Sequence, residues 1–263
     1  MVEQPLDDLL TMIRQERQGL IRGLRITIFI GPVAVGGIFK GAAIATSKVL
    51  DDHFSQNPES LDYHAPADLL SPEALRILLI SWMRDTCQGF EAYAVPMQQK
   101  FAENVALLRA ARILGMERYT RHILTVFVEY FKTELPSYEE ITTVERNATS
   151  DKDPLWTAMV NHLCFCRYKE LVPDPEDFAA YLALHPRLKQ AMVEADEYSR
   201  NKARKEWEAL RRSGKLGKTK GAPGGRGMRL RGKRASPRRG RLLNCFARRM
   251  EAKGGSGLLL RIC

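Results

Sequence analysis

Apolar residues recur at helical spacing near the start of the chain, between Leu6 and Ile21. Because apolar side chains three and four positions apart share one helix face, this pattern predicts an amphipathic helix within residues 1–22. The charged residues between them, among them Arg14 and Arg17, fall off the apolar face. They are therefore expected on the polar side of this helix.

An uncharged, β-branched run follows the first predicted helix. It predicts a β-hairpin with a strand at Ile26–Ile30, a Gly31-Pro32 turn and a second short strand around residues 37–39. A phosphate-binding loop would need Lys and then Ser or Thr directly after Gly36, where this chain has Gly and Ile. The run is also shorter than the roughly 18 apolar residues that a membrane-spanning helix requires. We therefore predict a hairpin, without a nucleotide site or a membrane span.

Most of the remaining chain favours helices with recognisable ends. Two short helices are expected on either side of Thr46-Ser47, followed by an extended piece near Leu61. Capping residues, often followed by proline, mark the later helix starts, because they satisfy or remove the free N–H groups of the first turn. These starts are Ser71-Pro72, Ser137 with Glu140, Asp153-Pro154, Asp174-Pro175 and Pro186, with Gly115 as the joint of a helix pair. The predicted fold class is α+β and mostly helical, with one small sheet, a helical cluster and a helical C-terminal extension.

Charge divides the chain into two unequal parts. Residues 200–263 contain 21 Lys and Arg but only 3 acidic residues, a net charge of +18, whereas residues 1–199 have a net charge of −8. From residue 214 the sequence is rich in Gly and Arg and poor in apolar residues. Such a segment cannot bury enough apolar surface to offset the entropy of ordering. Residues 214–263 are therefore predicted to be a disordered basic tail.

One basic cluster in this tail is a candidate for nuclear import or for contacts with nucleic-acid phosphates. Aromatic residues for base stacking are almost absent nearby, so sequence-specific recognition is not expected. A solvated tail without a function explains the composition equally well. The cluster consists of Arg229, Arg231, Lys233, Arg234, Arg238, Arg239 and Arg241.

Five cysteines lack the paired spacing of a zinc site or a disulfide framework, and their odd number favours a reducing compartment. His162 and Cys166 would share a helix face while Cys164 points elsewhere, so buried thiols are predicted rather than a metal site. Cys87 has no local signature of a catalytic nucleophile, although His53, His64 and His122 are conceivable bases. We expect no enzyme, no metal and no cofactor, and a location in the nucleus or cytoplasm.

The order of predicted elements and several segments resemble the BTB/POZ domain, particularly the divergent forms of fungal proteins. The resemblance covers roughly residues 24–131. Its best segment runs from Asn104-Val105 to Met116 and is similar to a helix of that family, as is the SPEALRILLISWM segment. Lys40 and Ser47 keep a spacing typical of the family, whereas Phe39 stands where the family usually has His.

The resemblance implies a BTB/POZ-like domain at residues 23–135 and a supporting helical extension at residues 136–213. It implies a protein–protein interaction module that self-associates through the first helix and the short helices after the hairpin, and an adaptor role toward a cullin-type ubiquitin ligase. The alternative is a nuclear protein that contacts nucleic acid nonspecifically through its basic tail; neither function involves a membrane. The residues expected to mediate self-association are Leu6, Leu9, Leu10 and Ile13.

Overall fold

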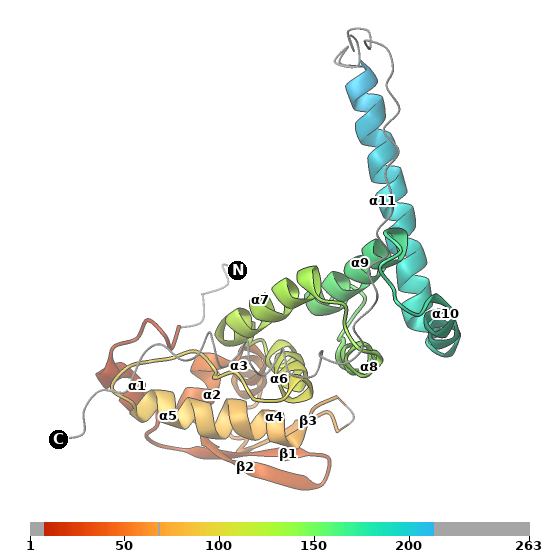
Figure 1. Cartoon of the computed structure of the whole chain (residues 1–263). Helices are drawn as coiled ribbons and strands as arrows, with labels where there is room; N and C mark the ends of the chain where they lie inside the picture. Colours follow the sequence, from red (N-terminus) through yellow and green to blue (C-terminus); the bar gives the residue numbers. More distant parts are fainter. Residues whose placement is uncertain (1–7, 68, 213–263) are drawn as a thin grey trace, which may run out of the picture. The chain divides into compact units, whose positions relative to one another are not determined.

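The structure is a computed structural model that describes residues 8–67 and 69–212. The described residues up to Ala203 belong to one compact unit, and residues 204–212 are the end of the last helix. Helices dominate, and three strands form one small mixed sheet (Figure 1). The predicted α+β, mostly helical fold class is therefore confirmed, while the predicted disordered tail lies outside the described residues.

The sheet has the strand order β2-β1-β3. Strands β1 (Arg25–Ile30) and β2 (Val33–Phe39) form the predicted antiparallel hairpin, and β3 (Asp62–Ala65) pairs with β1 in parallel. Gly31 in the turn has φ +55°, a left-handed conformation that glycine adopts without a steric penalty. The second strand is longer than predicted, because pairing continues from residue 39 back to Val33 through an irregularity between Ile28 and Phe29.

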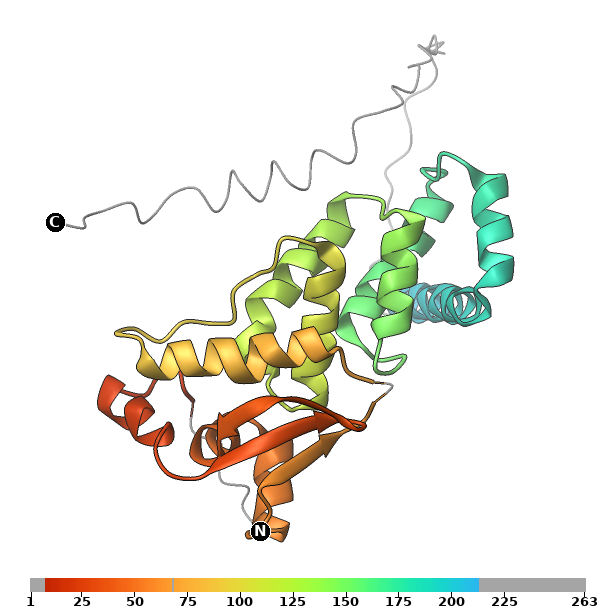
Figure 2. The same ribbon diagram turned by 90° about the horizontal axis from the view of Figure 1, so that it is seen from below.

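A continuous helical rod packs against the sheet. It consists of α4 (Pro72–Leu75), the π-helical segment η1 (Arg76–Trp82) and α5 (Met83–Gln88), and it begins at the predicted cap, Ser71. Gly36 of β2 allows close contact with this rod, because a Cβ there would collide with the end of the Ile80 side chain, which would then have to move. Figures 1 and 2 show this rod lying along the sheet from two directions.

Ser47 connects the short helices to the helix pair that follows. It separates α2 (Lys40–Thr46) from α3 (Lys48–Gln56), as predicted, and its Oγ accepts a hydrogen bond from the Leu50 N–H at 3.2 Å. The same hydroxyl donates to the Leu114 carbonyl at 2.6 Å. Leu114 lies at the joint between α6 (Phe101–Ile113) and α7 (Glu117–Thr133), beside Gly115 with φ +67°. The predicted glycine joint is thus confirmed.

The C-terminal helices begin where the capping residues predict. They are α8 (Tyr138–Asn147), α9 (Pro154–Tyr168), α10 (Pro175–Leu184) and α11 (Pro186–Arg212). Ser137 and Glu140 form the predicted capping box of α8. Helix α8 contacts α6, and α9 contacts α7, so packing is continuous across residue 135, where the sequence places a domain boundary.

The first helix is shorter than the sequence predicts. Instead of a helix over Leu6–Ile21, the structure has turns in residues 8–13 followed by α1 (Arg14–Leu20). The Asp8 carboxylate accepts a hydrogen bond from the Leu10 N–H at 3.1 Å. Such side chain to backbone bonds compete with helix formation. The Glu16 carboxylate then accepts from the Ile13 N–H at 3.0 Å, which fixes the helix start at residue 14.

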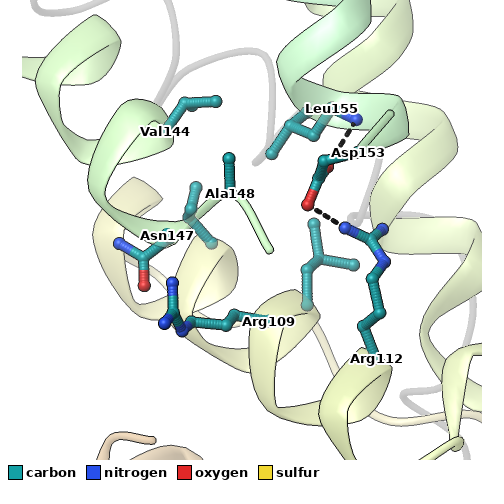
Figure 3. A pocket seen from close by; sticks show the side chains of 9 residues that line it. Arg109, Arg112, Val144, Asn147, Ala148, Asp153 and Leu155 are labelled. Carbon is teal, nitrogen blue, oxygen red and sulfur yellow. Dashed lines mark hydrogen bonds and ion pairs between the residues drawn. The ribbon is translucent and has the colours of Figure 1, made fainter. Parts of the chain in front are cut away.

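An ion pair between Arg112 of α6 and Asp153 fixes the C-terminal helices to the domain (Figure 3). The Asp153 side chain is 5% exposed, and it also accepts hydrogen bonds from the Leu155 N–H at 3.0 Å and the Thr149 N–H at 3.2 Å. The adjoining pocket has a volume of about 10 Å³, which is about the room that one water molecule needs. This joint is therefore structural rather than a small-molecule site.

We predict that Asp153→Ala lowers the free energy of unfolding by about 3 kcal/mol, because it leaves the partly buried Arg112 charge unpaired and removes the α9 cap. Urea denaturation measures this change. Asp151→Ala is the matched control, because the Asp151 side chain is 79% exposed in its pair with Arg187 and an exposed pair contributes at most about 1 kcal/mol. Equal losses in the two variants would contradict a structural role for Asp153.

Candidate interaction surface

The four residues expected to mediate self-association have different environments. Leu9 is fully buried, and its N–H donates to the Tyr119 hydroxyl at 3.3 Å, so it packs within its own chain. Leu10 is partly buried, whereas Ile13 is 62% exposed. Leu6 lies outside the described residues. Of the described members of this set, Ile13 is thus the most accessible to a second molecule.

Arg17 of α1 is buried, which contradicts its expected place on the polar side of a helix. It is only 3% exposed. Its Nε donates to the Thr86 carbonyl at 3.0 Å, and its Nη2 donates to the Gly89 carbonyl at 3.1 Å and the Phe90 carbonyl at 3.0 Å. These acceptors lie at the carboxyl end of α5, where unpaired carbonyls and the helix dipole favour a positive charge. Arg17 therefore joins α1 to the end of α5.

Phe90 is held beside α1 but is itself exposed. Its carbonyl accepts from Arg17, and the Arg14 guanidinium lies 5.7 Å from the centre of its ring. The Phe90 residue is nevertheless 79% exposed. Leu10, Ile13, Arg14 and Phe90 are here called the α1–Phe90 surface. Ile13 and Phe90 are its accessible apolar side chains, and Arg14 is its cation. Hydrogen bonds from Arg17 fix the backbone near them.

Neither the exposure of Phe90 nor the burial of Arg17 beneath this surface is predicted from the sequence. A Gly89-Phe90 pair after a helix is a weak sign of an exposed aromatic residue. The role of Arg17 depends on carbonyl groups about 70 positions away along the chain, and no local pattern reveals such a contact. The basic cluster from Arg229 to Arg241 lies outside the described residues.

Two residues that support the BTB/POZ resemblance have packing roles. Lys40 donates through Nζ to the carbonyls of Pro58 and Ser60, and its ammonium group lies 4.9 Å from the centre of the Phe54 ring. Ser47 connects α3 to the joint at Leu114, as described above. Both side chains therefore fix loops and helices to one another.

The thiols of α9 are buried, as predicted. His162 Nε2 lies 3.2 Å from the Cys166 Sγ, while the Cys164 Sγ donates to the Met192 carbonyl at 3.4 Å. Burial raises the pKa of Cys164 to about 12. In the contacting pair, burial raises the pKa of Cys166 and lowers the pKa of His162. Both shifts oppose an ionised pair, and the described residues include no group of three possible metal ligands.

Cys87 has an environment that disfavours a reactive thiolate. It is fully buried in α5, and burial raises its pKa to about 11 despite the nearby Arg17 charge. The predicted candidate bases His53 and His64 instead pack against aromatic rings, His53 against Tyr63 and His64 against Phe29. The geometry therefore supplies no activating partner for Cys87 from these two residues.

Comparisons with known proteins add no relative, because no family model, no curated protein and no solved structure matches this chain. Within residues 8–67 and 69–212, no helix has both the length and the apolar character needed to cross a bilayer. The structure itself defines a mostly helical α+β protein with the exposed α1–Phe90 surface.

We predict that Cys87, Cys164 and Cys166 react slowly with an aromatic disulfide reagent near pH 8. The raised pKa of Cys87, from 9.0 to about 11, lowers its thiolate fraction roughly a hundredfold, and burial restricts access further. The measurement uses a variant in which Cys245 and Cys263 are replaced by Ser, so only the three described thiols contribute. All three should react rapidly in urea; a fast-reacting thiol in the native protein would contradict the prediction.

Proposed function

We propose that this protein is a protein–protein interaction module that self-associates through the α1–Phe90 surface. The observation that carries the proposal is an exposed aromatic side chain on an immobilised backbone. Phe90 is 79% exposed, while its carbonyl is bonded to the buried Arg17. A surface fixed before binding loses less conformational entropy when a partner docks, and accessible apolar groups supply the driving force.

The resemblance to BTB/POZ domains supports the same proposal. The hairpin, the paired short helices around Ser47, the third strand, the capped rod and the helix pair joined at Gly115 follow the order on which that resemblance rests. The same resemblance supports a narrower proposal, that the protein acts as an adaptor for a cullin-type ubiquitin ligase. The packing of α8 on α6 and of α9 on α7 would give such an adaptor a supported helical extension.

We predict that Phe90→Asp weakens self-association about thirtyfold, because loss of a central aromatic anchor costs about 2 kcal/mol or more. Sedimentation equilibrium of the full chain measures the dissociation constant. Leu9→Asp would be a poor test, because Leu9 is fully buried and its replacement would destabilise the fold.

Tyr168→Asp is the matched control, because Tyr168 is also 79% exposed but lies at the end of α9. It should leave the dissociation constant unchanged. A wild-type protein that is monomeric at every concentration, or equal effects of the two substitutions, would refute the proposed surface.

A second candidate function is nonspecific nucleic-acid binding in the nucleus through the basic tail. The observation that favours it is the net charge of +18 in residues 200–263, against −8 in residues 1–199. Cationic side chains release condensed counterions when they bind a phosphate backbone, so the affinity depends strongly on salt. In this alternative, the folded part associates copies of the tail.

We predict that the full chain binds DNA or RNA with an affinity that falls at least tenfold between low and physiological salt. Fluorescence anisotropy with a labelled oligonucleotide measures the affinity. Replacement of the seven basic residues from Arg229 to Arg241 by Gln should remove most of this binding and leave self-association unchanged. Salt-independent binding, or binding that survives the replacement, would exclude the tail cluster as the contact.

A further inference from the structure

The sheet ends in two edge strands, β2 and β3. An edge strand exposes backbone N–H and C=O groups that can pair with another extended chain, and proteins usually prevent this with charges, proline or very short strands. Strand β3 has only four residues. Strand β2 has seven residues, VAVGGIF, with neither a charge nor a proline. The longer edge therefore lacks the usual protection within its own sequence.

The hairpin register shows which β2 groups face this edge. The Lys40 N–H donates to the Leu24 carbonyl at 2.9 Å, which makes positions 24 and 40 a hydrogen-bonded pair. Hydrogen-bonded and non-hydrogen-bonded pairs alternate along an antiparallel ladder. Phe39 opposite Arg25, and Gly37 opposite Thr27, are therefore non-hydrogen-bonded pairs. The backbone N–H and C=O groups of Gly37 and Phe39 point away from β1, toward the free edge.

A side chain of the neighbouring strand covers one of these groups. Arg25 of β1 lies opposite Phe39, and its guanidinium extends over the Phe39 ring, 5.1 Å from the ring centre. Its Nη2 then donates to the Gly37 carbonyl at 3.0 Å. Arg25 thus occupies an acceptor that an added strand would need, and it places a positive charge at the edge.

The opposite edge is covered in the same manner. The Thr27 N–H donates to the Leu61 carbonyl at 2.8 Å, so the alternation places the Asp62 carbonyl on the side away from β1. The Ser60 hydroxyl donates to this carbonyl at 2.9 Å, and His53 Nε2 lies 3.3 Å from it. Each edge of the sheet therefore has an outward carbonyl that a side chain already occupies.

We propose that Arg25 blocks antiparallel pairing of β2 with β2 of a second copy of this chain. The second copy is the fitting occupant, because a two-fold axis would place identical strands against each other. An uncharged strand brings no like charges together in such a pair, and Gly36 and Gly37 present no side chains that would obstruct it. The guanidinium of Arg25 is then the main obstacle to a sheet that continues across two molecules.

The test compares full-length Arg25→Met with Arg22→Met in a Phe90→Asp background. Both substitutions remove one positive charge from an exposed arginine, but only the first frees the Gly37 carbonyl. Methionine can still cover the Phe39 ring, and Arg25→Ala serves as a second variant if Arg25→Met perturbs the fold, which circular dichroism reports. The background weakens association through the α1–Phe90 surface equally in both variants, so the difference between the variants does not depend on the proposed function.

We expect Arg25→Met to show about twice the weight-average mass of Arg22→Met in light scattering at high salt, as pairing of two copies requires. The amides of residues 37 and 39 should also exchange more slowly with solvent. Adding Ala34→Lys, an edge charge of the usual protective kind, should restore the lower mass. Equal masses in the Arg25 and Arg22 variants, or a higher mass that survives Ala34→Lys, would overturn the proposal.

Discussion

The arrangement of the N-terminal part depends on the buried guanidinium of Arg17. One side chain donates hydrogen bonds to the carbonyls of Met12, Thr86, Gly89 and Phe90, and so connects the start of the domain with the end of α5. The bond to Thr86 is buried and the other three are partly buried. Because a carbonyl removed from water without a donor is costly, the arginine and these acceptors stabilise one another. The exposed positions of Ile13 and Phe90 follow from this contact, because the backbones that carry them are fixed by it.

Two further contacts make the rest of the compact unit continuous. The Ser47 hydroxyl joins the short helices to the α6–α7 joint, and Asp153 joins α6 to the start of α9. Both residues also cap a helix. Each side chain therefore bonds to the free N–H groups of a helix start and to a partner far away along the chain. The helices after residue 135 are consequently packed on the domain through α6 and α7 rather than attached only by the chain.

Local chemistry explains what the sequence could predict. Ser71, Ser137 and Asp153 mark helix starts because a capping side chain bonds to backbone within the same turn. Gly31-Pro32 marks the hairpin because glycine accepts a positive φ and proline fixes φ at about −65° in a turn. The burial of Arg17 depends on carbonyls brought near only by the fold. The prediction of a helix around Leu9 was wrong because the Asp8 carboxylate accepts a hydrogen bond from the adjacent backbone. The spacing of apolar residues carries no information about such a bond. The parallel pairing of β3 and the exposure of Phe90 likewise depend on tertiary contacts.

The π-helical segment η1 has a consequence for the insertion and deletion of residues. It lies between α4 and α5 in one rod, from Arg76 to Trp82, and its wider turns accommodate more residues per turn than an α-helix. Leu78, Leu79 and Trp82 in this segment are all buried, so the widened turns still direct apolar side chains inward. The rod is therefore the part of this domain where a change of one residue in length could be absorbed by rewinding, whereas in α6 the same change would rotate every buried side chain that follows.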